Sequence, residues 1–163
     1  MSSWSSRLGL TREAFLVSSR ATVAAVLSLL LSRSLKLPEF YWAPISTIVI
    51  LLSTLNPLTL AWQRFAGTAI GSLLGALIAY GPRQNWIVYG VGLFIRGILS
   101  SMLRIGAAYR FAAIALTIVV LVAHDGTPWT VALHRFIEVS VGIAVALVVT
   151  ALWRLPKSGT VKT

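Results

Sequence analysis

Long apolar runs recur along the whole chain at intervals of roughly 20 to 30 residues, and short polar segments separate them. Hydrophobic residues make up 57% of the 163 residues and charged residues only 11%. A soluble domain of this size carries about 25% charged residues. Because so few charges cannot cover a surface that faces water, the pattern predicts a polytopic helical membrane protein and not a soluble domain.

Turn-forming residues divide the apolar runs into six predicted helices. The breaks fall at Pro38, at Asn56-Pro57 and at residues 81–85, 104–106 and 125–128. The second and fifth helices have only about 15 residues, which is roughly 23 Å against a hydrocarbon core of about 30 Å. The expected helices cover residues 14–35, 41–55, 62–80, 86–103, 109–124 and 131–153.

The predicted fold class is therefore all-α, with a membrane domain over residues 14–154 between polar ends. Residues 1–13 are polar and lack a small-residue cleavage site, so we expect no removable signal peptide. Residues 155–163 form a basic tail. With an even number of spans, both ends lie on the same side of the membrane.

The basic residues predict which side that is. Nine lie on the side of the two ends and four on the other, which favours cytoplasmic termini. The net charge of +10 does not indicate nucleic-acid binding, because the Lys and Arg residues occur singly, mostly at the ends of apolar runs. The nine are Arg7, Arg12, Arg20, Arg64, Arg104, Arg110, Arg154, Lys157 and Lys162; the four are Arg33, Lys36, Arg83 and Arg135.

Two stretches of the chain spell nearly the same sequence. Residues 57–71 are PLTLAWQRFAGTAIG and residues 128–142 are PWTVALHRFIEVSVG. One constant offset in numbering pairs Arg64 with Arg135, Phe65 with Phe136, Gly71 with Gly142 and Phe40 with Phe111. Each half, residues 14–80 and 86–153, holds three predicted spans, so the second half enters the membrane in the opposite sense. This predicts a 3+3 inverted-topology repeat, an architecture common in secondary transporters.

Small residues form a smooth ridge on the third predicted helix. Gly67, Gly71 and Gly75 are each four residues apart, and Gly142 begins a weaker version of the ridge in the sixth helix. Helices in lipid associate by close packing, which small residues at this spacing permit. We expect tight helix packing here, with a ligand-lining slit as the alternative.

Arginines inside the apolar runs are the strongest candidates for function. Arg96 lies ten residues into the fourth predicted helix, where a charge is costly unless it faces protein, water or an anion. It is the first candidate for an anion pathway, and a structural pairing with Glu138 or a backbone carbonyl is the alternative. Arg20, Arg64 and Arg135 are further candidates, although Arg20 could also extend toward the interface.

His134, Arg135 and Glu138 lie on one face of the sixth predicted helix. They form either an internal ion pair at the helix entrance or a proton-coupling relay of Glu138 and His134.

Enzymatic chemistry has no support in the sequence. There is no G-x-S-x-G nucleophile elbow, no H-E-x-x-H zinc motif and no phosphate-binding loop, and Cys is absent. With two His and four acidic residues, we expect no metal site and no cofactor, and any transport to be passive or driven by a gradient.

Three segments resemble a known family. FYWAPISTIVI at 40–50, QRFAGTAIGSLLGALI at 63–78 and YRFAAIALTIVVL at 109–121 are similar to the fusaric acid resistance protein-like (FUSC) family. The resemblance implies a six-helix inner-membrane module that moves organic anions, often aromatic carboxylates. Family members commonly attach a cytosolic domain or a second membrane module. This sequence shows neither, so we expect its modules to pair as a homodimer or a larger homo-oligomer.

The expected function is therefore the transport or export of organic anions, aromatic carboxylic acids above all. The lipid bilayer and an organic anion are the expected partners. A passive anion channel and a non-transporting membrane scaffold or accessory subunit are the alternatives.

Overall fold

The computed structural model describes residues 12–79, 86–102, 108–122 and 127–153. These residues are helical and contain no β-strand, as the sequence predicts. The helices are α1 (Arg12–Ser34), α2 (Trp42–Leu51), α3 (Pro57–Ile78), α4 (Trp86–Met102), α5 (Ala108–Thr117) and α6 (Pro128–Leu152), and a π-helical segment, η1 (Ile118–Val122), continues α5.

Much of the charge pattern used to predict the topology lies outside the described residues. The basic residues concerned are Arg7, Arg83, Arg104, Arg154, Lys157 and Lys162. The same is true of residues 1–11 in the polar N-terminal segment and of the basic tail 155–163. The cytoplasmic position of the termini therefore stays a prediction.

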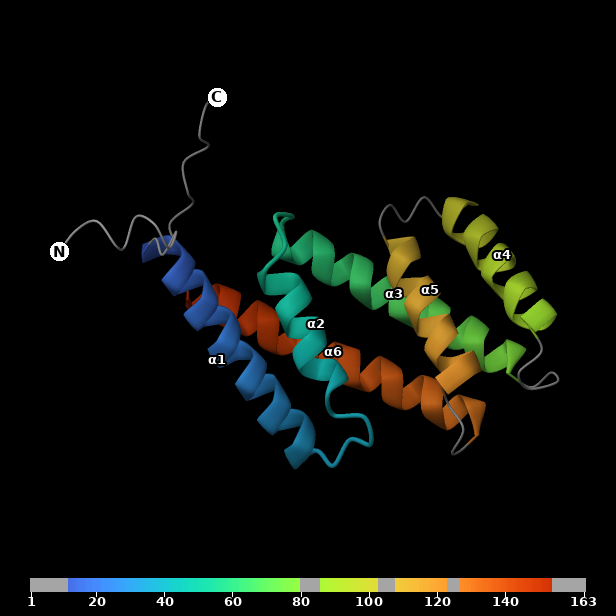
Figure 1. Ribbon diagram of the computed structural model, residues 1–163, viewed down its shortest axis with the longest axis horizontal. Helices are drawn as coiled ribbons and strands as arrows, with labels where there is room; N and C mark the ends of the chain where they lie inside the picture. Colours follow the sequence, from blue (N-terminus) through green and yellow to red (C-terminus); the bar gives the residue numbers. More distant parts are fainter. Residues whose placement is uncertain (1–11, 80–85, 103–107, 123–126, 154–163) are drawn as a thin grey trace, which may run out of the picture.

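The two longest central helices, α3 and α6, pack against each other and carry the shorter helices. Helix α5 packs on α3, and α2 packs on α6 (Figure 1). Helix α1 lies at one end of the molecule against α2 and α6, and α4 lies at the other end against α5 and α3. Helices α2 and α5 therefore each pack mainly on a long helix from the other half of the chain.

Two prolines begin helices, although the sequence pattern indicated that they end the preceding segments. Pro57 and Pro128 occupy the first turns of α3 and α6, so both helices begin earlier than predicted. Proline is well tolerated there because that N–H has no partner inside the helix and its φ is already helical. The side chains of Asn56 and Thr127 cap the two helices by accepting from the N–H groups of Leu58 and Thr130.

The second helix is shorter than the predicted range of 41–55. Helix α2 ends at Leu51, and the hydroxyl of Ser53 accepts a hydrogen bond from the N–H of Leu55 in the turn that follows. A side chain that bonds to nearby backbone groups favours a turn over a helix. At 10 residues, α2 spans about 15 Å.

The fifth helix is not a continuous α-helix as predicted over 109–124. After Thr117 the chain widens into the π-helical η1. The Thr117 hydroxyl donates to the carbonyl of Ala113, four residues earlier, and also bonds to the Tyr89 hydroxyl at 3.0 Å.

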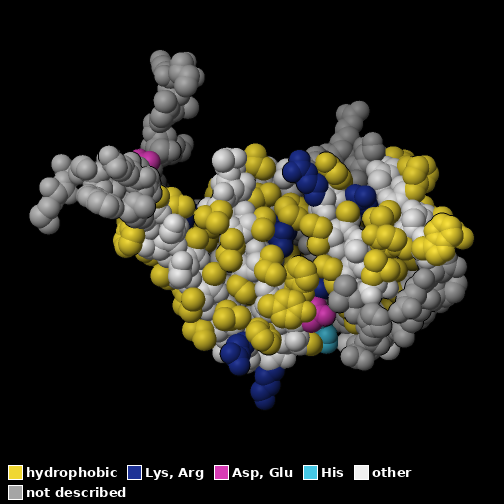
Figure 2. Space-filling view, in the orientation of Figure 1, with side chains coloured by type: hydrophobic (Ala, Val, Ile, Leu, Met, Phe, Trp, Pro, Cys, Tyr) yellow, Lys and Arg dark blue, Asp and Glu magenta, His cyan; other side chains and the backbone are white. Residues whose placement is uncertain are grey.

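Two of the described helices, α1 and α6, are long and apolar enough to cross a membrane. The described residues therefore do not form six helices that are each long enough to span a membrane, because α2 and the α-helical part of α5 have only 10 residues each. Figure 2 shows hydrophobic side chains spread across the described part of one face. Exposed examples include Trp86 at 80% and Phe94 at 70%. This surface suits contact with lipid.

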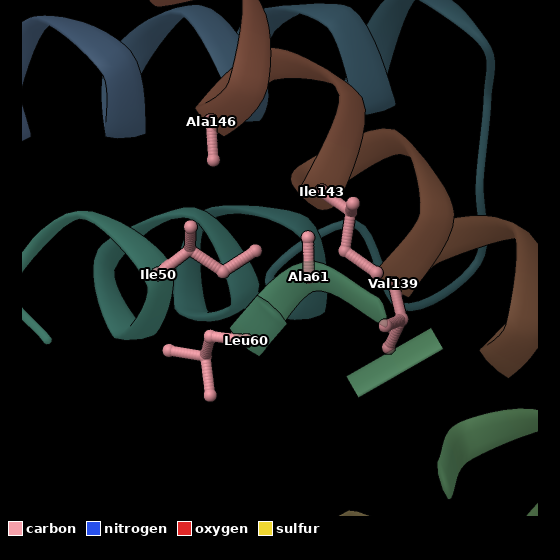
Figure 3. Packing of buried hydrophobic residues seen from close by; sticks show 6 residues of the cluster. All are labelled: Ile50, Leu60, Ala61, Val139, Ile143 and Ala146. Atoms are coloured by element: carbon pink, nitrogen blue, oxygen red, sulfur yellow. The ribbon is translucent and has the colours of Figure 1, made fainter. Parts of the chain in front are cut away.

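The main buried apolar cluster lies where α2, α3 and α6 meet. Its members are Ile50, Leu60, Ala61, Val139, Ile143 and Ala146 (Figure 3). The two alanines in this set keep the three backbones close together. The cluster adjoins Phe65, whose ring lies 4.9 Å from the ring of Phe136.

The glycines of α3 lie directly against α5. A Cβ added to Gly71 would collide with the backbone of Ala112, its Cα at 2.8 Å, and one added to Gly75 would lie 2.9 Å from Cβ of Val119. Gly67 meets the carbonyl of Ala108, and Gly142 in α6 meets the carbonyl of Ala43 in α2. All four glycines thus allow close packing between halves of the chain.

Replacement of Gly71 by alanine tests this packing. Because the colliding atoms belong to the backbone of Ala112, Gly71→Ala should lower the free energy of unfolding by about 1–3 kcal/mol. The measurement is thermal unfolding in a fixed detergent. Gly90→Ala is the matched control, since an added Cβ there meets nothing within 4 Å. Equal melting temperatures for both variants would contradict the close approach.

Candidate functional site

Two arginines from the central helices are buried inside the helical domain. Arg64 in α3 has 7% of its surface exposed and Arg135 in α6 has 2%. Each is the eighth residue of its helix, counted from the prolines at 57 and 128. The same helix register therefore brings both guanidinium groups to the interior, where a charged group is costly without compensation.

Each guanidinium lies over an aromatic ring from the other half of the chain. Cζ of Arg64 is 4.9 Å from the ring centroid of Phe111 in α5, and Cζ of Arg135 is 3.9 Å from the ring of Trp42 in α2. The negative face of an aromatic ring attracts a cation, more strongly where water is excluded. The four residues form a crossed pair of arginine–ring contacts.

The ring contacts revise the sequence alignment of the two halves. The offset that pairs the two arginines also places Phe40 opposite Phe111, but the ring that has the same contact as Phe111 is Trp42. Phe40 lies under Arg33, whose Cζ is 5.4 Å from its ring centroid. The number of residues from the ring to the arginine of the same half therefore differs between the pair Trp42 and Arg64 and the pair Phe111 and Arg135.

Arg135 is held by carboxylates. Its Nη2 donates to Oε2 of Glu39 at 2.8 Å, and its Nη1 lies 3.9 Å from Oε2 of Glu138. The backbone N–H of Glu39 donates to Oε1 of Glu138 at 2.8 Å. Glu138 is fully buried, whereas the Glu39 side chain is 29% exposed. The face of α6 predicted to hold an ion pair therefore also binds a residue from the connection between α1 and α2.

Arg64 has no such partner among the residues that the structure describes. Its Nη2 donates to the hydroxyl of Ser46 at 3.1 Å, and that hydroxyl donates to the carbonyl of Trp42. Among the residues that the structure describes, no carboxylate lies within ion-pair distance of Arg64. Within this part of the chain, a neutral hydroxyl and an aromatic ring are thus the compensation for a buried positive charge.

The two arginines line one small cavity of about 20 Å³, enough for about one water molecule. Nε of Arg64 and both Nε and Nη1 of Arg135 have no hydrogen-bond partner in the described part of the chain. Together they could donate to an anion. The lining residues are Trp42, Arg64, Thr68, Phe111, Ile114, Ala115, Ile118, Arg135 and Val139.

Three other predicted residues lie outside this cavity lining. Nη1 of Arg96 donates to the carbonyl of Tyr109 at 2.6 Å and joins α4 to the start of α5, in line with the structural alternative considered for it. Nη2 of Arg20 donates to the hydroxyl of Thr150 at 2.9 Å and joins α1 to α6. His134 is half-buried on α6.

Residues 23–149 match the model of the fusaric acid resistance protein-like family. The chain belongs to this family. The match runs from α1 almost to the end of α6 and includes Arg64, Arg135 and the residues that contact them. Neither curated proteins nor solved structures give a significant match. Membership in this family, together with the apolar helices α1 and α6, indicates a membrane protein with a transport-related function.

Sequence reasoning missed Glu39 and the two rings in this family member. A signal for Glu39 was available, because the chain has only four acidic residues and its arginines within apolar runs need compensation. The rings had no such signal, since aromatic residues are common at the ends of membrane spans. Only the packing of α2 on α6 and of α5 on α3 places them over the arginines.

Removal of the Arg135 charge alone should destabilise the protein more than removal of the charges of both Arg135 and Glu138. Arg135→Leu leaves the fully buried Glu138 without its cation, so we expect a loss of roughly 3–5 kcal/mol in the free energy of unfolding. Addition of Glu138→Gln should restore part of that loss. Thermal unfolding of both single variants and the double variant measures the coupling. Additive losses would contradict an interaction between these residues.

Proposed function

We propose that this protein carries organic anions across the membrane and takes their carboxylate group between Arg64 and Arg135. The observation that carries the proposal is the burial of Arg64 without an acidic partner among the described residues, on a cavity that a second arginine shares. A cation in a low-dielectric interior is costly, and a carboxylate that pairs with it compensates that cost. Arginine also offers donors spaced to bind both carboxylate oxygens.

The remaining walls of the cavity support aromatic acids as the substrate class. Besides the arginines, the lining consists of Trp42, Phe111 and the aliphatic side chains Ile114, Ala115, Ile118 and Val139, with one hydroxyl from Thr68. Ligand sites of this kind combine apolar walls with a few polar groups that fix orientation. An aromatic ring gains contact area with such walls, whereas a small inorganic anion does not.

The described conformation is a closed one in this proposal. A cavity of about 20 Å³ is too small for an aromatic acid, so helices must separate before one enters. Helices α2 and α5 supply the rings over the arginines and are the shortest α-helices that the structure describes. We expect access to open where α2 leaves α6 on one side and where α5 leaves α3 on the other.

The proposed architecture is the 3+3 inverted repeat, with α1–α3 and α4–α6 as its halves. Its support is the matching pair of helix starts, the crossed arginine–ring contacts and the contact of Phe65 with its counterpart Phe136. Equivalent residues touch where a pseudo-two-fold axis passes between them. Transporters built in this way bind substrate at the interface of the halves, which is where Arg64 and Arg135 lie.

Proton coupling through Glu138, with His134 beside it, belongs to the same proposal. Glu138 is fully buried, and its Oε2 has no hydrogen bond to any described residue. A proton there would weaken the hold of Glu138 on Arg135. The proposed assembly is a homodimer or a larger homo-oligomer, which native mass spectrometry in detergent measures.

Uptake of radiolabelled benzoate into liposomes tests the proposed site. Arg64→Gln should lower the initial rate at least tenfold, because it removes the buried charge that lacks a counterion among the described residues. Arg12→Gln, an exposed arginine at the start of α1, is the control with the same change of charge. Arg96→Ala separates the two pathways considered. Loss of uptake in Arg96→Ala with full uptake in Arg64→Gln would move the path to α4.

A pH gradient tests the coupling. With an inward proton gradient, the initial rate of benzoate uptake into wild-type vesicles should exceed the rate without a gradient. Empty vesicles correct for diffusion of the neutral acid. Glu138→Gln should still let benzoate equilibrate but should no longer respond to the gradient. A gradient response that persists in this variant would exclude Glu138 as the coupling residue, and single-channel currents in the wild type would favour a channel.

A further inference from the structure

The two arginine positions are equivalent in the chain but unequal in charge. Each arginine is the eighth residue of its helix and lies over a ring. Arg135 contacts two carboxylates, whereas Arg64 contacts none among the described residues. When the two arginines are aligned, Gly67 takes the position of Glu138. The offset that aligns the two arginines places Arg110 opposite Glu39, and the offset that aligns the two rings places Ala108 there. Neither residue is acidic.

We propose that Glu39 is an internal carboxylate ligand of Arg135 that the transported anion must displace, and that it thereby sets the affinity of the site. The inference rests on the proposed transport function. Glu39 binds Nη2 of Arg135 at 2.8 Å, with the same chemical group that an organic acid would present. The protein's own carboxylate and the substrate therefore compete for one guanidinium.

Glu39, and not Glu138, is placed to leave. Glu138 lies within α6, is fully buried and stays 3.9 Å from Nη1 of Arg135. Glu39 lies in the connection between α1 and α2, and its side chain is 29% exposed. A carboxylate that reaches water is solvated when it gives up its partner, whereas a buried one is not. Exchange of Glu39 for a substrate carboxylate also keeps the charge next to Arg135 unchanged.

The backbone around Glu39 can stay in place while its side chain moves. Its N–H donates to Oε1 of Glu138 at 2.8 Å, and the next residue, Phe40, accepts a hydrogen bond from the Ser32 hydroxyl at 3.0 Å. The N–H of Leu37 bonds to the carbonyl of Ser32. These contacts fix the connection to α1 and α6 without using the Glu39 carboxylate. Rotation of the Glu39 side chain is then sufficient to expose Nη2 of Arg135.

The same competition explains the difference between the two arginines. Arg64 is available to an incoming anion at once, while Nη2 of Arg135 becomes available only after Glu39 has left. The apparent affinity of a ligand falls by the fraction of protein that is in the competent state. Neutralising Glu39 should therefore tighten anion binding, although it removes an ion pair from the native structure.

The test is the concentration of benzoate that gives half-maximal uptake into liposomes. Glu39→Gln keeps the size of the side chain but removes its charge, so it should lower this concentration about tenfold. Glu39→Asp keeps the charge and should lie closer to wild type. Glu13→Gln, an exposed acid on α1, is the matched control and should not differ from wild type. Thermal unfolding checks the fold, and Glu39→Ala replaces the glutamine variant if that one melts early.

Each outcome decides between the two proposals. An unchanged or raised half-maximal concentration in the folded Glu39 variants, with uptake in the wild type that depends on Arg64, overturns the role of Glu39 alone. Uptake in no variant overturns the transport function and this inference with it. Uptake that is tighter in the neutral variants, or that appears only in them, supports Glu39 as the displaceable ligand.

Discussion

Two guanidinium groups buried inside the helical domain are the constraint on which the rest of the structure depends. Arg64 and Arg135 are almost completely buried in a chain with only four acidic residues. An aromatic ring covers each of them, and the two described carboxylates at this site, Glu39 and Glu138, both lie against Arg135. The packing of α2 on α6 and of α5 on α3 supplies these partners, so the fold and the candidate site are one arrangement.

Close packing and charge burial support each other in this molecule. Gly67 and Gly71 let α5 approach α3 closely enough for Phe111 to lie over Arg64, and Gly142 does the same for α2 and Trp42 over Arg135. Helices in lipid gain nothing from the hydrophobic effect against one another, so such contacts and the polar interactions between helices hold them together. Larger residues on these faces would move the rings away from the charges.

The departure from symmetry carries the functional argument. Nearly equal sequences at 57–71 and 128–142 give equal helix starts, equal arginine positions and equivalent ring contacts. Glu138 in place of Gly67, together with Glu39, makes the charges unequal. A site with one arginine held by carboxylates and one without a carboxylate partner among the described residues suits a single negatively charged group, in line with the proposed binding of one carboxylate.

The sequence by itself determined the helical class, the membrane character, the family and the repeated arginines, because these follow from composition, periodicity and local motifs. The boundaries inferred at Pro57 and Pro128 were wrong, since proline both ends and begins helices. Only the tertiary structure decided that Arg64 and Arg135 share a cavity, that Arg96 bonds to a backbone carbonyl and that Glu39 reaches Arg135. Those contacts join residues far apart in the chain, and helix packing, not local sequence, sets which faces meet.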